Sequence, residues 1–196
     1  MNSQTNETSP KQEREIRLHI GMRNIKTALA ATICALIYFP FSRNPTFACI
    51  GAIFGMGRDL EDSKRNGGNR LFGTVIGGLL GMLLYFLYIQ IRPEGGVHPL
   101  LFVFLFIGVI ILVLICQALV LPGAIQPAGV VLCIILFNTP VDAYIAYSLN
   151  RILDTAIGVV IAIIINVVVS KENIEKVKQF TRHLPQLFAY KKKHIS

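Results

Sequence analysis

Long apolar runs separated by short polar segments make up most of this chain. From Val97 to Thr139 there is no Asp, Glu, Lys or Arg over 43 residues, more than one membrane-spanning helix requires. Pro, Gly and Asn punctuate the segments between the runs. The pattern predicts an all-α polytopic membrane protein with six transmembrane helices, within residues 25–41, 46–57, 71–91, 99–119, 122–138 and 144–169.

Polar segments flank this apolar region. We expect a cytoplasmic N-terminal segment at 1–22, a six-span membrane module at 23–170 and a cytoplasmic tail at 171–196. The first 20 residues lack the cleavage pattern of a secretory signal, so the first span is expected to stay in the mature protein. In the tail, apolar residues at steps of three and four predict an amphipathic helix, with a solvated basic tail as the alternative. They are Ile174, Val177, Phe180, Leu184 and Leu187.

Composition and charge agree with a membrane protein and predict its orientation. The chain is 53% hydrophobic and 15% charged, whereas soluble domains carry about a quarter charged residues. If the N-terminus is cytoplasmic, 16 of the 19 basic residues fall on that side, leaving Arg43, Arg92 and Arg151 at the other. The positive-inside rule therefore predicts that both termini face the cytoplasm. We expect a multi-pass protein of the plasma membrane. Since topology accounts for the net charge of +8, no nucleic-acid partner is expected.

Side chains that would indicate an enzyme or a metal site are scattered. Cys34, Cys49, Cys116 and Cys133 lie in apolar runs without a C-x-x-C pair, and the four histidines form no cluster. The sequence has no nucleophile–base constellation, P-loop or metal-ligand spacing. We therefore expect neither catalysis nor a bound metal or cofactor.

Two nonamers 81 positions apart share one pattern, NRLFGTVIG at 69–77 and NRILDTAIG at 150–158. Each follows a span, a P-x-x-x-x-P pair (at 40/45 and 122/127) and a short apolar segment. Each half contains three spans, so the second copy would enter the membrane upside down relative to the first. This pattern predicts a 3+3 inverted repeat, as in many secondary transporters, with chance similarity between apolar helices as the alternative.

Helical spacing places the small and polar residues of the repeat on one face of each helix. Offsets of 0, 4, 7, 11 and 15 give Arg70, Thr74, Gly77, Gly81 and Tyr85 in one copy, and Arg151, Thr155, Gly158, Ala162 and Asn166 in the other. The glycines, together with Gly51, Gly55 and Gly73, indicate close helix packing. The polar members, with Asp154 beside them, also suit a hydrated substrate pathway, and the two interpretations are compatible.

Asp154 and Arg151 lie three residues apart, and two interpretations of them stay open. The pair can neutralise itself, or Arg151 receives an anionic substrate while Asp154 takes up a proton or competes for Arg151.

The short segments 46–57 and 128–138 also allow two interpretations. They either mark a central site at matching places in the two halves, or are ordinary spans that continue into the polar loops.

Three motifs resemble the aromatic acid exporter family, part of the wider fusaric-acid-resistance (FUSC) superfamily, with plant aluminium-activated malate transporters as distant relatives. They are GMRNIKTALA at 21–30, N-R-x-x-G-T-x-x-G-G at 69–78 and N-R-x-x-D-T-x-I-G-x-x-I-A-x-x-x-N at 150–166. The resemblance covers roughly residues 20–170 and implies a six-helix module that moves organic anions, commonly as an oligomer. Larger members have two modules and a sizeable cytosolic domain, whereas this chain has one module.

The leading hypothesis is an exporter of aromatic or other organic acids driven by the proton gradient. Arg23, Lys26 and Arg70 would concentrate anions at the inner mouth, and Asp154 offers a titratable group. A passive anion channel and a membrane scaffold that only docks partners are the alternatives. We also predict a homo-oligomer, most simply a dimer, because the glycine faces offer packing surfaces beyond the needs of one module.

Overall fold

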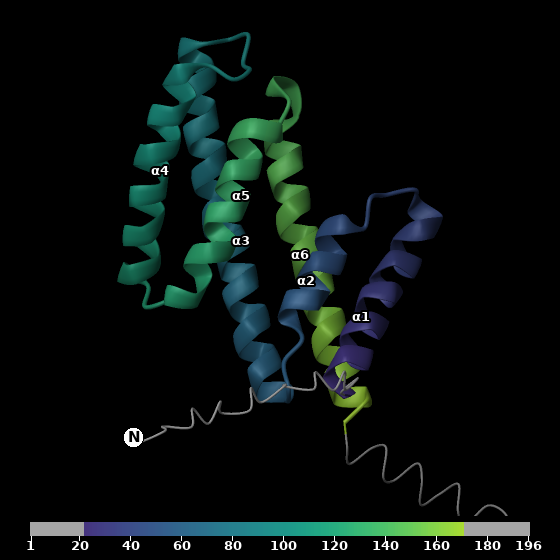
Figure 1. The fold of residues 1–196 in the computed structure, drawn as a ribbon. Helices are drawn as coiled ribbons and strands as arrows, with labels where there is room; N and C mark the ends of the chain where they lie inside the picture. The colour runs from purple at the N-terminus through teal and green to yellow at the C-terminus, as the bar shows by residue number, and fades with distance from the viewer. Residues whose placement is uncertain (1–21, 171–196) are drawn as a thin grey trace, which may run out of the picture.

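The computed structural model describes residues 22–170, and within that range the chain is helical without a β-strand (Figure 1). Its α-helices are α1 (Met22–Tyr38), α2 (Thr46–Gly55), α3 (Leu60–Ile91), α4 (Pro99–Ala118), α5 (Ile125–Asn138) and α6 (Tyr144–Val168). Short 3-10 turns precede or follow three of them, at η1 (Phe39–Phe41), η2 (Pro122–Ala124) and η3 (Val141–Ala143). The predicted amphipathic tail at 171–196 and the N-terminal segment up to residue 21 lie outside the described residues.

Four of the helices are long and apolar enough to cross a membrane: α1 with η1, α3, α4, and α6 with η3. The two shorter apolar helices coincide with the short segments of the sequence. At about 1.5 Å per residue, α2 is about 15 Å long, half of a hydrocarbon core of about 30 Å. Of the six predicted transmembrane helices, four are therefore long enough to cross a membrane. Helix α2 does not continue into the polar segment that follows it.

The end of α2 and the beginning of α3 have a local cause. The Gly57 amide donates a hydrogen bond to Ser63 Oγ (2.8 Å), which turns the chain back on itself. Asp59 Oδ1 then accepts the Asp62 amide (2.8 Å) as an N-cap, and Glu61 and Asp62 place negative charge in the first helical turn. As a result α3 begins at Leu60, eleven residues before the apolar run that was predicted as its start.

The helices form two lobes that meet where α3 and α6 run side by side (Figure 1). In one lobe, α1 and α2 pack on α6, and a buried cluster that includes Cys34, Ala48 and Ala162 joins them. In the other, α4 and α5 pack on α3 around Leu84, Leu112 and other buried residues. Each short helix thus packs chiefly on the long helix of the opposite half of the chain.

Glycines permit these close approaches. A Cβ at Gly158 on α6 would overlap the carbonyl oxygen of Ala48 on α2, and one at Gly77 on α3 would overlap the carbonyl oxygen of Ala128 on α5. The other glycines singled out in the sequence also face neighbouring helices: Gly51 and Gly55 face α6, and Gly73 and Gly81 face η2 and α5. The surfaces on which the oligomer prediction rested are thus filled within one chain.

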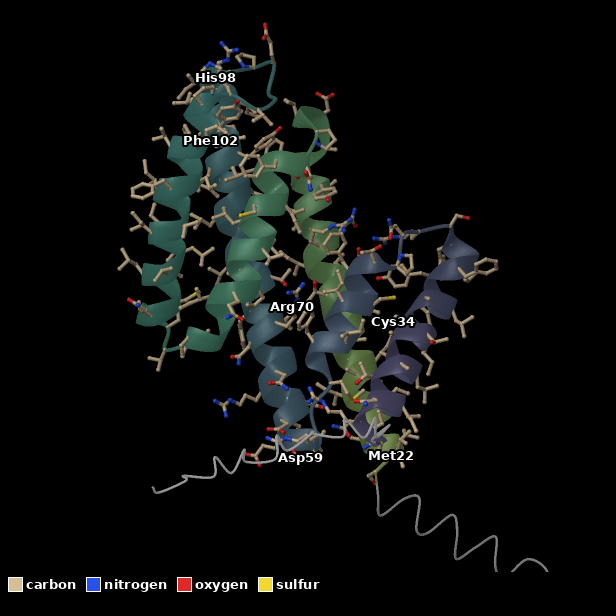
Figure 2. All side chains as sticks on the ribbon, viewed as in Figure 1. Met22, Cys34, Asp59, Arg70, His98 and Phe102 are labelled. Atoms are coloured by element: carbon tan, nitrogen blue, oxygen red, sulfur yellow. The ribbon has the colours of Figure 1, made fainter. Side chains whose placement is uncertain are left out.

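The outer surface of the described region is strongly apolar. On α4, the side chains of Phe102, Phe106 and Leu114 are exposed, and Phe102 points outward in Figure 2. Because α4 carries no charged side chain, this surface suits contact with lipid or another apolar chain rather than with water. The chain is a membrane protein.

Candidate functional site

Arg70 is the centre of the site. It lies on α3 between the two lobes, at mid-height between Asp59 at one end of the molecule and His98 at the other (Figure 2). Arg70 is only 9% exposed, and its guanidinium carbon lies 5.4 Å from the centroid of the Phe54 ring on α2. Its Nε is buried without a hydrogen-bond partner, and within residues 22–170 no carboxylate forms an ion pair with it. A buried cation without a counter-ion is costly, so Arg70 is a candidate for a functional group.

A cavity of about 340 Å³ opens beside Arg70. Asn66, Asn69 and Arg70 share one face of α3, since they lie at positions i, i+3 and i+4. The rest of the lining comes from Phe54 of α2, Gly123 of η2, and Gln126, Pro127 and Val130 of α5. The cavity thus combines one cation, three neutral amides and an apolar wall, and its volume lies in the range of small-molecule sites.

Two residues near Arg70, Thr74 and Gly123, offer the cavity no side-chain ligand. Thr74 is buried, and its Oγ1 donates to the carbonyl of Arg70 (2.8 Å), so the hydroxyl is used within its own helix. Gly123 in η2 leaves room for the amide of Asn69, which a Cβ at this position would overlap. Phe54, Asn66 and Gln126 were not singled out in the sequence, because only the fold brings α2 and α5 to this face of α3. Asn69 appeared there as the first residue of the repeated motif.

The second group of polar residues surrounds Asp154 on α6. This carboxylate is only 2% exposed, and its Oδ1 accepts hydrogen bonds from Tyr38 Oη (2.7 Å) and Arg43 Nη2 (3.2 Å). Arg43, in the loop after α1, also donates to Asn150 Oδ1 (3.2 Å). The ion pair of Asp154 in the described chain is therefore with Arg43 and not with Arg151. Sequence spacing gave no indication of this pair, because the two residues lie 111 positions apart.

Arg151 lies in the same region but faces aromatic rings. Its guanidinium carbon is 3.5 Å from the Phe47 ring centroid and 4.4 Å from the Tyr147 ring centroid. Its Nε is buried without a hydrogen-bond partner. Thr155, one turn further along α6, is buried where α6 meets Gly51 of α2, so it contributes to packing at this crossing.

The third group lies at the end of the molecule where α1 and α3 begin. Lys26 is buried and donates from Nζ to Asn166 Oδ1 (2.8 Å). Asn166 Nδ2 donates in turn to the Asp59 carbonyl (2.6 Å) and to Ser63 Oγ (2.7 Å). This network joins α1, α6 and the start of α3. The structure thus brings Lys26 and Asn166 together, away from the residues that line the Arg70 cavity.

Arg23 lies near this third group but faces a different surface. Its Nη2 donates to the carbonyl of Met56 (3.2 Å), which holds the end of α2. With Thr27 and Ile53 it lines a groove between α1 and α2 that is separate from the Arg70 cavity. The eight predicted pathway residues therefore occupy four places, and Arg70 is the one of them that lines the cavity of about 340 Å³.

Comparison with known proteins places these features in a family context. The chain matches the family model described as aromatic acid exporter family member 1 over residues 18–169. It is 30% identical over 150 residues to a UPF0421 protein of Staphylococcus haemolyticus, which covers 76% of this chain and 43% of that protein. A UPF0421 protein of Staphylococcus epidermidis is 28% identical over 150 residues, with the same coverage of 76% and 43%. The chain thus spans less than half the length of these curated relatives. No solved structure matches it.

Proposed function

The chain belongs to the aromatic acid exporter family, and from this membership we propose that it exports organic anions, foremost aromatic carboxylic acids, across the plasma membrane. The observation that carries the proposal is the buried guanidinium of Arg70, which has no counter-ion among the described residues and borders a cavity of about 340 Å³. A carboxylate is the ligand that such a group binds best, because its two oxygens match the planar fork of donors.

The other lining residues suit the rest of an aromatic acid. Phe54, Pro127 and Val130 offer an apolar wall for a ring, and the amides of Asn66, Asn69 and Gln126 can pair with hydroxyl groups on it. In the proposed complex the carboxylate binds the N–H groups at the edge of the Arg70 guanidinium, while the Phe54 ring stays in contact with its face. An inorganic anion would leave the apolar wall unused.

We also propose that the two halves form an inverted repeat, and one matched pair of contacts supports this. Asn166 on α6 donates to the Asp59 carbonyl after α2 (2.6 Å), and Tyr85 on α3 donates to the Thr139 carbonyl after α5 (2.8 Å). Asn166 and Tyr85 lie 81 positions apart, the same offset as the two nonamers. In such transporters, substrate sites lie at the interface between repeats, and residues from both halves of this chain line the Arg70 cavity.

In the proposed orientation, both termini face the cytoplasm and Asp59 lies at the cytoplasmic end of α3. Arg70 is then reached from the cytoplasm, and the Asp154 group lies toward the outside. We propose that export is driven by the proton gradient, with Asp154 as the group that exchanges a proton. Its burial in a membrane-spanning helix supports this role, because ionisable residues at such positions are usually functional.

Flux into proteoliposomes that contain the purified chain tests the proposal. Radiolabelled benzoate is expected to accumulate against its concentration gradient under an imposed pH gradient, and Arg70→Gln is expected to abolish this accumulation. Arg58→Gln is the matched control. Arg58 is an exposed arginine just before α3, the helix that carries Arg70, and it pairs with Asp62. Flux that only runs downhill would make the protein a passive anion channel. Equal flux in Arg70→Gln and wild type would contradict the site, and no flux with any carboxylate would contradict transport.

A further inference from the structure

Arg151 is a second cation in the described chain that lacks a counter-ion. The ring centroids of Phe47 and Tyr147 lie 3.5 and 4.4 Å, respectively, from its guanidinium carbon. Its Nε is buried and unpartnered, and no carboxylate within residues 22–170 is close enough to form an ion pair with it. Rings cover the face of the guanidinium but leave its N–H groups, which point along the plane, without acceptors. A planar carboxylate is the ligand that satisfies them.

The nearest candidate partner on the same helix is already engaged. Asp154 follows Arg151 by three positions on α6, a spacing at which side chains can meet. Its Oδ1 instead accepts from Tyr38 and Arg43, and Arg43 is held in turn by Asn150. These contacts come from α1 and from the loop after it. The chain therefore supplies a cation and a tyrosine from other elements to hold the carboxylate that would otherwise neutralise Arg151.

Helix α2 connects Arg151 with Arg70. Phe47 lies against Arg151 and Phe54 lies against Arg70. The two phenylalanines are seven residues apart, so they lie on one face of α2, separated by about 10 Å along the helix axis. This face of α2 therefore carries one ring against each arginine.

We infer that Arg151 is a second binding station for the carboxylate held at Arg70, and that Arg43 keeps this station open by holding Asp154 away from it. The inference rests on the proposed function, since it takes the same ligand. Arg151 is the binding residue, and Phe47 and Tyr147 form its walls. Arg43 is a positioning residue, because it acts on the ligand only through Asp154.

Equilibrium binding of radiolabelled benzoate to the full chain in lipid nanodiscs tests the second station. The wild type is expected to bind two benzoates per chain, while Arg70→Gln and Arg151→Gln each bind one. Arg92→Gln, which alters an exposed arginine at the end of α3, is expected to bind two. If Arg151→Gln does not fold, Arg151→Lys serves in its place. Loss of the planar fork should then weaken the second site roughly 10- to 100-fold.

The role of Arg43 has its own measurement in the same assay. Arg43→Gln is expected to weaken the second site roughly tenfold, because Asp154 is then released to pair with Arg151. Asp154→Asn in the Arg43→Gln background should restore the wild-type affinity, which a merely structural role for Arg43 would not produce. If Arg43→Gln weakens benzoate binding at the second site and Asp154→Asn does not restore it, the proposed role of Arg43 is overturned.

The remaining outcomes separate this inference from the proposed function. A single benzoate per chain in the wild type, lost in Arg70→Gln and kept in Arg151→Gln, would overturn the second station and leave the Arg70 site intact. No benzoate bound by the wild type would overturn the proposed function and the second station together.

Discussion

Gly158→Ala is expected to destabilise the protein, because α2 packs directly on this position. A Cβ here would overlap the carbonyl oxygen of Ala48 and lie 2.8 Å from the amide nitrogen of Ala52. Both atoms belong to the backbone of α2, so no side-chain rotation relieves the overlap and α2 has to move away from α6. The same substitution would be harmless if the two helices only met through flexible side chains.

The size of the effect follows from two opposing contributions. Overpacking a tight site costs about 1–3 kcal/mol, and overlap with backbone places this site near the upper end. Replacing glycine by alanine inside a helix returns roughly 0.5–1 kcal/mol. The net loss is about 2 kcal/mol, which corresponds to a fall in melting temperature of roughly 4–8 °C for a chain of this size.

Thermal unfolding of the purified protein in one detergent provides the assay. Gly68→Ala and Gly129→Ala are the matched controls, because both positions are helical and a Cβ at either has no other atom within 4 Å. Their melting temperatures should stay equal to the wild-type value or rise. Gly77→Ala, which meets the carbonyl of Ala128, should lose about as much as Gly158→Ala. Equal melting temperatures for Gly158→Ala and Gly68→Ala would refute the close α2–α6 contact.

Three further results are expected. Tyr38→Phe should lower the stability by about 1.5–3 kcal/mol, because it removes a hydrogen bond to the buried Asp154 carboxylate; thermal unfolding measures this, and an unchanged melting temperature contradicts it. Glu94→Cys, in the exposed loop between α3 and α4, should react with an impermeant maleimide added outside intact cells, whereas labelling only after lysis would invert the proposed orientation. Native mass spectrometry in nanodiscs should show a dimer held by apolar surface such as that of α4, and a monomer at all concentrations would rule this out.

Hydropathy located most of the helices because the signal is local. Runs predicted at 99–119 and 144–169 correspond to α4 (Pro99–Ala118) and α6 (Tyr144–Val168). The start of α3 was not found, because the Asp59 cap and the helical polar stretch after it carry no hydrophobic periodicity. Capping residues before an acidic first turn could have indicated it.

The candidate site was less predictable, and the reason is long-range contact. The repeated nonamers pointed to Arg70 and Arg151, since charged residues beside apolar helices stand out in sequence. Their surroundings come from elsewhere in the chain: Phe54 lies against one and Phe47 against the other. The partner of Asp154 was expected three residues away, but Arg43 from a distant loop takes that place. Local spacing identifies which side chains can meet, and the fold decides which of them do.

The central claim is that Arg70 holds the carboxylate of the transported acid. The most direct test is a crystal of the protein grown with 4-bromobenzoate, in which the anomalous signal of bromine locates the ring. A bromine peak is expected in the cavity between Phe54 and Gln126, with the carboxylate on the guanidinium of Arg70. Bromobenzoate bound elsewhere, with this cavity empty at saturating ligand, would contradict it.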